Sequence, residues 1–304
     1  MEPPAGGSVN SGPSVPTGPV VVGVDHSPHA QAVALWAAAE AALRGRTLCV
    51  LHAASTEHMG ILLSGTDLAA IDQANTALLD RTVQAVRHAF PLLHVVTELT
   101  HSTPAAALRT AAQTEGTIVV GSRDINGFEE FLLGSVALQL TTHPKEPVIV
   151  VRGDTGRPAT GVVVAAVHHA EDFDWLRLAA AESQLRQASL RLTTVRTPLH
   201  TLGSAVLTAH RPDGPAHQPA AELARLADRL RREFPDLTVS TQVANAKSWA
   251  DPLLRATEHA DLLAVGHQVT ESLGSPSGQV LHVLLHKAHC PLAIFPHDRG
   301  AGGP

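Results

Sequence analysis

Two segments in the first half of the chain end in residues suited to binding an anion. The apolar run VVVGVDHS ends near Asp25, and the run VVGSRDINGFEEFLLGSVA leads from Gly121 to Gly134 and Ser135. A glycine such as Gly121 lets a ligand approach the backbone closely. If a helix starts at Gly134, the amides of Gly134, Ser135 and Val136 lack helical acceptors and lie at the positive end of the helix dipole. We therefore expect a phosphate site at this helix start.

Three side chains bear on the strength of this expected site. Ser135 offers a hydroxyl donor, and Arg123 offers a charge-assisted hydrogen bond. Asp124 brings a carboxylate towards the same place, where an unshielded like charge costs about 1–4 kcal/mol at about 4 Å. A bound Mg²⁺ would reverse the sign of that effect. The alternative stays open that the segment is only a connection between a strand and a helix.

The second half of the chain carries a weaker version of the same features. Its first apolar run ends VVVAAVHH, and we take Val167 as the equivalent of Asp25, so that no carboxylate is available there. The glycine that matches Gly134 is Gly278, but Gln279 follows it in place of a hydroxyl residue. The loop before Gly278 is also one residue shorter. We predict that this half does not hold a phosphate in the same way.

Histidines near the end of the chain raise the question of a metal. His282, His286 and His289 fall at i, i+4 and i+7 of one expected helix, next to Cys290. That spacing places them on a common helix face and could seed a zinc site. No carboxylate lies close to them in sequence. We predict that the chain has no metal site.

The elements that must position these residues belong to the α/β class. Short β-branched runs alternate with Ala- and Leu-rich segments of helical period, a pattern typical of a buried parallel sheet. In the first half we expect strands at 19–25, 47–53, 94–100, 117–121 and 147–151, and helices at 28–44, 67–89, 104–115 and 134–143. In the second half we expect strands at 161–167, 189–195, 237–243, 261–266 and 291–296, with four helices between them.

The two halves repeat each other. The segment AAAEAALRGRTLCV at 37–50 matches AAAESQLRQASLRL at 179–192 with an offset of 142 residues, and PVIVV near the end of the first half matches PLAIF in the second. We therefore predict two tandem doubly wound domains, each a five-stranded parallel sheet with four helices. Ligands bind such sheets beyond the carboxyl ends of the strands, where the strand order reverses. The predicted divisions are a disordered tail at 1–18, domain 1 at 19–151, a linker at 152–160, domain 2 at 161–297 and a tail at 298–304.

Several motifs give the chain a resemblance to the universal stress protein family. They are VGVD near the N-terminus, VLHA at 50–53, and GSR followed by GF, LLGSV and a closing PVIVV. The resemblance covers 19–151 well and 161–296 more loosely. It implies a fold like that of the adenine nucleotide alpha hydrolases, and ATP held through a pattern of Gly, two residues, Gly, nine residues, then Gly and Ser or Thr. In this chain Asp124 takes the place of the second glycine.

The resemblance also implies roles for individual residues. Asp25 would bind the adenosine end of the nucleotide, and Ala53 would line the base pocket. Ribose and phosphates would lie against Gly121, Gly134, Ser135 and Val136. His26 stands where the family usually has glycine, so His26 and Asp124 together decide whether the pocket is open.

Charge and hydropathy bound the partners. The net charge of −6, with 28 acidic and 22 basic residues interleaved, argues against nucleic acid as the main partner. No apolar run approaches the roughly 20 residues of a membrane-spanning helix, and the N-terminus lacks the features of a signal peptide. Two cysteines, Cys49 and Cys290, cannot form a disulfide framework. We expect a cytoplasmic protein that does not attach to membranes.

The function expected from these observations is that of a universal stress protein in which domain 1 binds ATP, with or without Mg²⁺, or another adenine nucleotide. Binding would regulate conformation or the choice of an unknown protein partner. No enzyme motif is present in the sequence, so we expect at most slow and incidental ATP hydrolysis. The alternative is a nucleotide-free interaction module. In either case the last strands of the two halves are expected to pair within the chain, and homodimerisation stays open.

Overall fold

The structure, a computed structural model, describes residues 17–55, 65–113, 115–122, 134–153, 156–168, 173–196, 219–268 and 276–297. The predicted tails at 1–18 and 298–304 lie outside these ranges, apart from residues 17 and 18. Arg123 and Asp124 lie outside them as well.

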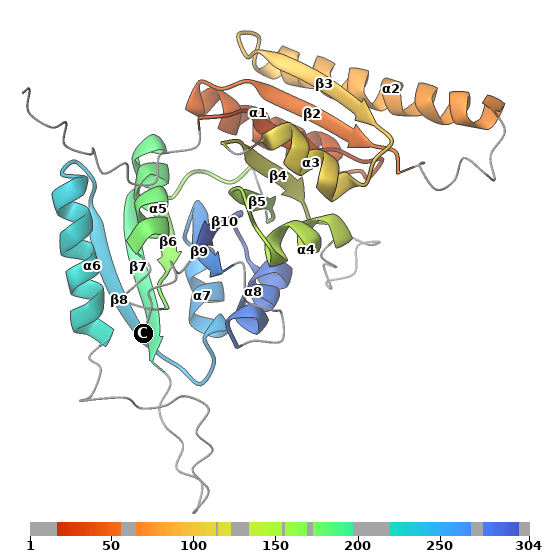
Figure 1. Ribbon diagram of the computed structural model, residues 1–304. Helices are drawn as coiled ribbons and strands as arrows, with labels where there is room; N and C mark the ends of the chain where they lie inside the picture. The colour runs from red at the N-terminus through yellow and green to blue at the C-terminus, as the bar shows by residue number, and fades with distance from the viewer. Residues whose placement is uncertain are drawn as a thin grey trace, which may run out of the picture.

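In the residues that the structure describes, each half of the chain forms five strands and four helices, as predicted (Figure 1). The elements of domain 1 are β1 (Val20–Gly23), α1 (Ala30–Arg44), β2 (Leu48–Ala53), α2 (Gly65–Ala89), β3 (Val95–Thr100), α3 (Pro104–Ala112), β4 (Thr117–Gly121), α4 (Ser135–Thr142) and β5 (Val148–Val151). Those of domain 2 are β6 (Val162–Ala166), α5 (Phe173–Leu185), β7 (Ser189–Arg196), α6 (Pro219–Glu233), β8 (Val239–Asn245), α7 (Ala250–Thr257), β9 (Leu262–Gln268), α8 (Pro276–Lys287) and β10 (Leu292–His297).

All ten strands form one continuous sheet in the order β3-β2-β1-β4-β5-β10-β9-β6-β7-β8. Every neighbouring pair is parallel except β5 and β10, which are antiparallel and join the two domains. The prediction that the last strands of the two halves pair is therefore confirmed. Within domain 1 the order reverses between β1 and β4, which is where a doubly wound sheet opens a ligand site.

Helices cover both faces of the sheet. One buried cluster packs α1, α2, α5 and α6 against one face, and a second cluster packs α3, α4, α7 and α8 against the other. The central strands are consequently apolar on both sides, which explains why their sequences are continuous Val-rich runs. On α1 the buried residues that face the sheet are mainly alanines, and small side chains let the helix approach the strands closely.

The helices α1 and α5 end in the same kind of turn. Gly45 follows α1 in the left-handed conformation, with φ of 61°, and its N–H donates to carbonyls of the last turn. Gln187 takes the equivalent place after α5, also left-handed, with φ of 53°. Glycine adopts this conformation at no steric cost, whereas glutamine does not.

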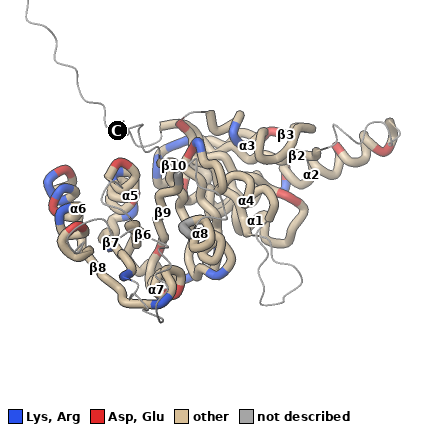
Figure 2. The backbone as a smooth tube through the Cα atoms, turned by 60° about the horizontal axis from the view of Figure 1, so that its bottom comes forward, with Lys and Arg blue, Asp and Glu red and all other residues tan. Residues whose placement is uncertain are grey.

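Charged residues are mixed over the surface. Figure 2 shows Lys and Arg interspersed with Asp and Glu along α6, where the sequence is rich in arginine. Within α6 a pair of side chains, Arg231 and Asp228, lies 2.7 Å apart. In the described part of the chain no helix is both long enough and apolar enough to span a bilayer.

Candidate functional site

A cavity of about 760 Å³ lies at the carboxyl ends of β1, β2 and β4. The start of α4 and parts of α1 and α2 complete its wall. Its volume is in the range typical of small-molecule sites, roughly 300–1,000 Å³. The cavity therefore occupies the place where the strand order of domain 1 predicts a ligand.

Six of the predicted site residues line this one cavity: Asp25, Ala53, Gly121, Gly134, Ser135 and Val136. They come from β1, β2, β4 and α4, elements that are far apart in the sequence. Arg123, the seventh, lies outside the described residues. The structure thus brings together the described residues of the predicted site, while their role in nucleotide binding stays a prediction.

The start of α4 opens on the cavity. Gly134 is the N-cap residue, with extended backbone and no side-chain hydrogen bond to the helix. Its carbonyl accepts the first helical bond, from Leu138 at 3.0 Å, so the amides of Ser135 and Val136 have no acceptor within the helix. Unpaired amides at the positive end of a helix dipole attract an anion.

Gly121 at the end of β4 faces α1 across a narrow gap. A Cβ atom added to Gly121 would lie 2.8 Å from Cγ2 of Val33. Both residues line the cavity. A larger side chain at either position would reduce the space in this part of the cavity.

The carboxylate at the tip of β1 is held in place by its own loop. One oxygen of Asp25 accepts a hydrogen bond from the N–H of Ser27 at 3.0 Å. The adjacent His26 lies 2.9 Å from Oδ1 of Asn75 on α2, and its ring lies edge-on to that of His52, with 5.4 Å between centroids. Both His26 and Asn75 line the cavity, which is present with a histidine at position 26.

Two polar residues of this wall, His52 and Asn75, were not among the predicted site residues. Nδ1 of His52 donates to the carbonyl of Val24 at 2.8 Å, since a carbonyl can only accept. Asn75 of α2 is buried and lines the cavity. The motif VLHA at 50–53 includes His52, but no local pattern marks Asn75, a polar residue in the middle of a helix, as part of a site.

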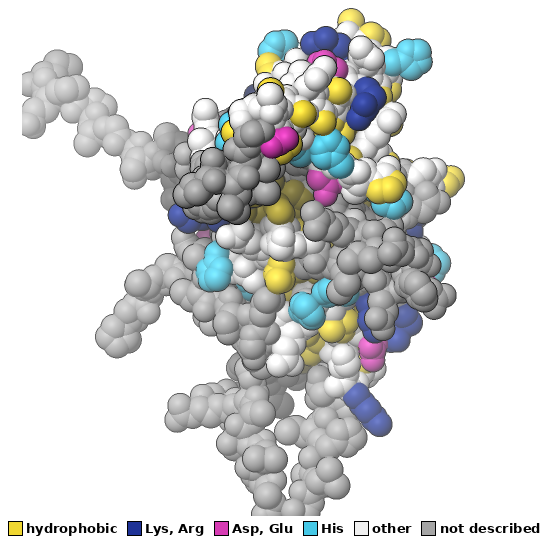
Figure 3. Space-filling model, turned by 90° about the vertical axis from the view of Figure 1, so that its right-hand side faces the viewer, with side chains coloured by type: hydrophobic (Ala, Val, Ile, Leu, Met, Phe, Trp, Pro, Cys, Tyr) yellow, Lys and Arg dark blue, Asp and Glu magenta, His cyan; other side chains and the backbone are white. Residues whose placement is uncertain are grey.

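The face of the molecule beside α2 is shown in Figure 3. Hydrophobic, histidine and acidic side chains lie near one another there, and Lys and Arg side chains are scattered over the visible described surface. The cavity wall itself contains three histidines, His26, His29 and His52, together with Asp25. No Lys or Arg is among the described lining residues, so the backbone amides at the start of α4 are the groups of this wall that suit an anion.

The strand pairing corrects one equivalence between the two domains. The N–H of Val24 donates to the carbonyl of Leu51 at 2.9 Å, and the N–H of Val167 donates to that of Thr193 at 2.8 Å. Val167 is therefore the equivalent of Val24, and our assignment of Val167 to the position of Asp25 was wrong. The offset between repeats is 142 residues for α1 and α5 but one residue more for β1 and β6.

His168 consequently takes the place of Asp25 in domain 2. Its ring stacks on the indole of Trp249 in a tilted arrangement, with 4.5 Å between centroids. The position equivalent to Asp25 therefore carries no carboxylate, as expected, but the residue there is His168 and not Val167.

Domain 2 fills the space that is open in domain 1. Gly266 at the end of β9 corresponds to Gly121 by strand pairing, and Trp175 on α5 corresponds to Val33. A Cβ atom added to Gly266 would collide with the indole ring of Trp175. Trp175 is only 2% exposed. The indole therefore occupies the region next to the strand end where the cavity of domain 1 lies.

The last helix of domain 2 also begins at a different point. The helix α8 starts at Pro276, so Gly278 lies in its first turn and is buried. In domain 1 the matching Gly134 precedes the helix as its N-cap. The start of α8 therefore lies at a different point of the repeat from the start of α4.

The predicted histidine cluster is brought together only in part. The rings of His282 and His286 lie 4.3 Å apart, and burial together with His286 lowers the pKa of His282. Cys290 is fully buried, which raises the pKa of its thiol to about 12. Among the described residues no three or more His, Cys, Asp or Glu side chains are placed to hold a metal ion.

The sequence of this chain is similar to the sequences of known proteins. Residues 17–152 and 161–296 each match the sequence profile of the universal stress protein family. A universal stress protein of Mycobacterium tuberculosis is 27% identical over 282 residues, which cover 90% of this chain and 95% of the relative.

Solved structures give the same picture of the fold. A universal stress protein from Archaeoglobus fulgidus superposes with a TM-score of 0.68 at 15% identity, covering 92% of this chain and 98% of that one. Another universal stress protein from the same organism, solved in complex with dAMP, is 25% identical over 45% of this chain, with a TM-score of 0.34.

Proposed function

The chain belongs to the universal stress protein family, as two domains in tandem, and we propose that domain 1 binds an adenine nucleotide while domain 2 binds none. The ligand would occupy the cavity at the carboxyl ends of β1, β2 and β4. ATP, with or without Mg²⁺, is the nucleotide that the family resemblance implies.

The observation that carries this proposal is the start of α4. The amides of Ser135 and Val136 have no acceptor within the helix and lie in the cavity wall. Burial of an anion elsewhere in this wall would be costly, because no Lys or Arg is among the described lining residues. The helix start is therefore the place where the phosphates would bind.

The remaining wall suits a nucleoside. Asp25 presents a carboxylate held by the amide of Ser27, and a carboxylate accepts hydrogen bonds from hydroxyl or amino groups of a ligand. The backbone and small side chain of Ala53 leave room for a flat ring beside β2. This arrangement agrees with the roles that the resemblance implies for these residues.

We propose further that the site binds without rapid turnover. The described lining residues contributed by β4 and α4 include no titratable side chain. A general base near the phosphates would have to come from residues outside the described ranges. Regulation is the more direct use of the site, because the far end of α4 reaches domain 2. There the carbonyl of Thr142 lies 3.3 Å from Nε2 of His267.

A calorimetric titration of the full chain with ATP and Mg²⁺ tests the proposal. Gly134→Asp should lower the affinity by about 100-fold or more, because it places an anion where a phosphate must approach the helix start. Gly65→Asp is the matched control. It adds the same charge at the start of α2, where a Cβ atom meets nothing within 4 Å and no cavity residue is altered. An unchanged dissociation constant in Gly134→Asp would show that the phosphates bind elsewhere.

The same titration also tests the alternative that the chain binds no nucleotide. No heat at high micromolar ATP with the wild-type chain would favour an interaction module without a ligand. Asp124, which lies outside the described residues, is tested by Asp124→Gly. Removing a carboxylate near the phosphates should tighten ATP binding, whereas weaker binding would indicate that Asp124 holds a metal ion.

A further inference from the structure

The joint between the two domains is a short pairing of apolar strands. The three register pairs of β5 and β10 are Val150 with Leu292, Ile149 with Ala293, and Val148 with Ile294. All six residues are aliphatic and buried. A shift of two residues in one direction would place Val151 opposite Ala293 and Val150 opposite Ile294, so aliphatic side chains would again meet in the middle of the pairing, with Arg152 opposite Leu292. Because these strands are apolar on both faces, they lack the alternation of apolar and polar side chains that helps to fix a register.

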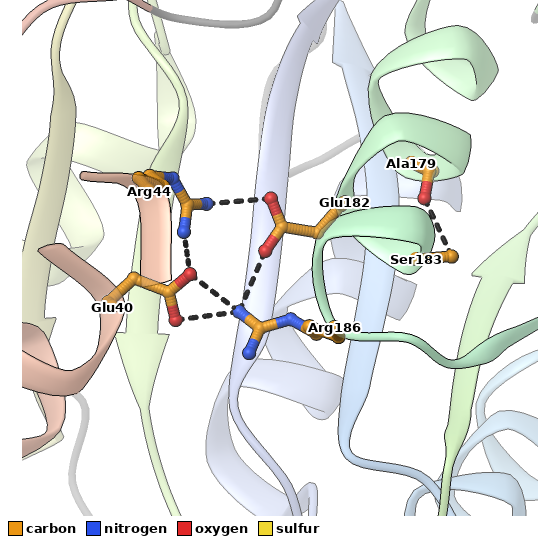
Figure 4. A network of polar contacts seen from close by, with 6 residues as sticks. All are labelled: Glu40, Arg44, Ala179, Glu182, Ser183 and Arg186. Carbon is orange, nitrogen blue, oxygen red and sulfur yellow. Dashed lines mark hydrogen bonds and ion pairs between the residues drawn. The ribbon is translucent and has the colours of Figure 1, made fainter. Parts of the chain in front are cut away.

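Four charged residues lie over the same joint, on the helix layer formed by α1 and α5 (Figure 4). Arg44 of α1 lies 2.6 Å from a carboxylate oxygen of Glu182 on α5, and Arg186 of α5 lies 2.6 Å from Glu40 on α1. Within each helix the two partners also pair, Arg186 with Glu182 at 2.7 Å and Arg44 with Glu40. The result is a closed charge square in which every member contacts two opposite charges.

The square is buried and has approximate twofold symmetry. The side chains of Glu40, Arg44, Glu182 and Arg186 are 2%, 7%, 8% and 15% exposed. Both helices use the same spacing, Glu followed four residues later by Arg, at equivalent positions of the repeat. The Arg186 guanidinium also lies 5.9 Å from the ring centroid of Trp36 on α1.

The four charges of the square are stabilised only while each lies beside its oppositely charged partners. Taking a charge out of water is costly unless its partners are in place, and breaking a buried pair costs far more than an exposed one. A slip of two residues moves one strand about 7 Å along the other. Such a displacement would separate both cross-domain pairs and leave four charges buried without their partners across the joint.

We propose that the charge square of Glu40, Arg44, Glu182 and Arg186 fixes the register in which domain 1 and domain 2 pair. Burial of the apolar strands β5 and β10 holds the two domains together, and the repeated Glu-x3-Arg motif of α1 and α5 determines the register in which they pair. The motif is self-complementary, so one helix that carries it recognises another. This inference does not depend on nucleotide binding.

Other contacts across the joint depend on the same register. Arg152, which follows β5, donates to the carbonyls of Leu285 and His286 at the end of α8. His267, at the end of β9, meets the carbonyl of Thr142 at the end of α4. Each of these contacts caps the C-terminus of a helix in the opposite domain. A change of register would remove both caps.

Charge reversal in the full chain tests the proposal without changing composition. Glu40→Arg combined with Arg44→Glu keeps the pair within α1 but places like charges opposite each other across the joint. The matching reversal on α5, Glu182→Arg with Arg186→Glu, restores all four attractions when it is added. The measurement is amide hydrogen exchange in β5 and β10, with β1 and β2 as an internal reference for the folding of domain 1.

The α1 reversal should speed exchange in β5 and β10 by about 100-fold or more relative to wild type, because a buried pair is broken at each crossing. The quadruple variant should regain wild-type protection. If the α1 reversal leaves β5 and β10 protected, the apolar strands alone fix the register and the proposal is wrong. It is equally wrong if the α1 reversal removes protection and the quadruple variant does not restore it, since the defect would then lie within α1.

Discussion

Domain 1 and domain 2 share one fold but differ in a single layer of side chains beneath the strand ends. At the end of β4, Gly121 faces Val33 and a cavity of about 760 Å³ is present. At the end of β9, Gly266 faces Trp175, whose indole fills the equivalent space. In this molecule, the size of the helix residue behind the sheet therefore separates a domain with a cavity beside the strand end from one in which that space is filled. The glycine at the strand end does not separate the two domains.

Two further differences point in the same direction. The strand tip carries Asp25 in domain 1 and His168 in domain 2, where the imidazole stacks on Trp249. The helix that follows begins after its glycine in domain 1 and before it in domain 2. Each element of the proposed site is therefore altered in domain 2, while the strands and the packing between them are kept.

Copying the domain 2 side chain into domain 1 should have the largest effect. Val33→Trp should fill the cavity and lower ATP affinity by at least about 100-fold, because the indole would occupy the ligand's place beside Gly121. Calorimetry measures the loss. Val33→Ile, which adds one methylene, serves as the control and should bind within a few-fold of wild type. Wild-type affinity in Val33→Trp would show that the ligand does not contact this part of the wall.

The reverse exchange should act on stability and not on binding. Trp175→Val removes a fully buried indole and should lower the free energy of unfolding by about 3 kcal/mol, measured by denaturant titration. No second nucleotide should bind, because domain 2 has His168 in place of the carboxylate, and α8 begins before its glycine whereas α4 begins after its own. A second binding event in this variant would mean that Trp175 alone closes domain 2.

The strand tip offers a smaller test of the same comparison. Asp25→His gives domain 1 the residue of domain 2 and should weaken ATP binding by about 10–100-fold. A hydrogen bond to a charged group contributes about 1.5–3 kcal/mol, and each 1.4 kcal/mol is a factor of ten. Asp25→Asn keeps an acceptor and should fall between this variant and wild type. Equal binding by all three would remove Asp25 from the site.

The smallest effect concerns the turns after α1 and α5. Gln187 has φ of 53° where domain 1 has Gly45. Gln187→Gly should raise the free energy of unfolding by about 0.5–1 kcal/mol, because glycine adopts the left-handed conformation without steric cost. The complementary change Gly45→Gln should lower it by a similar amount in the same denaturant titration. Stability changes of the opposite sign would show that the turn is not the controlling feature.

Most of the fold could be predicted from the sequence because its signals are local and repeated. Valine runs marked buried parallel strands, alanine-rich segments marked helices, and the offset of 142 residues exposed the duplication. The pairing of PVIVV with PLAIF also followed from their position as last strands, and the β5–β10 pairing confirms it. The predicted residues of the cavity wall that the structure describes could be placed together because they come from strand ends or from the start of α4.

What the sequence could not predict depends on contacts between distant elements. Trp175 is an ordinary apolar residue in a helix pattern, and only the packing of α5 on β9 shows that it fills a cavity. The misassignment of Val167 arose because the repeat offset changes by one residue between the first strand of each domain and the helix that follows it, which only hydrogen bonding reveals. The charge square had a visible signal, since the pair Glu40 and Arg44 recurs in domain 2, each time directly after or within an alanine-rich segment. Their pairing across the joint still required the structure.

Calorimetric titration of the wild-type chain and of Val33→Trp with ATP tests whether one nucleotide binds in domain 1 beside Val33. One nucleotide should bind per wild-type chain, and none should be detectable in the variant at the same concentrations. Two nucleotides per wild-type chain, or undiminished binding in Val33→Trp, would contradict this prediction.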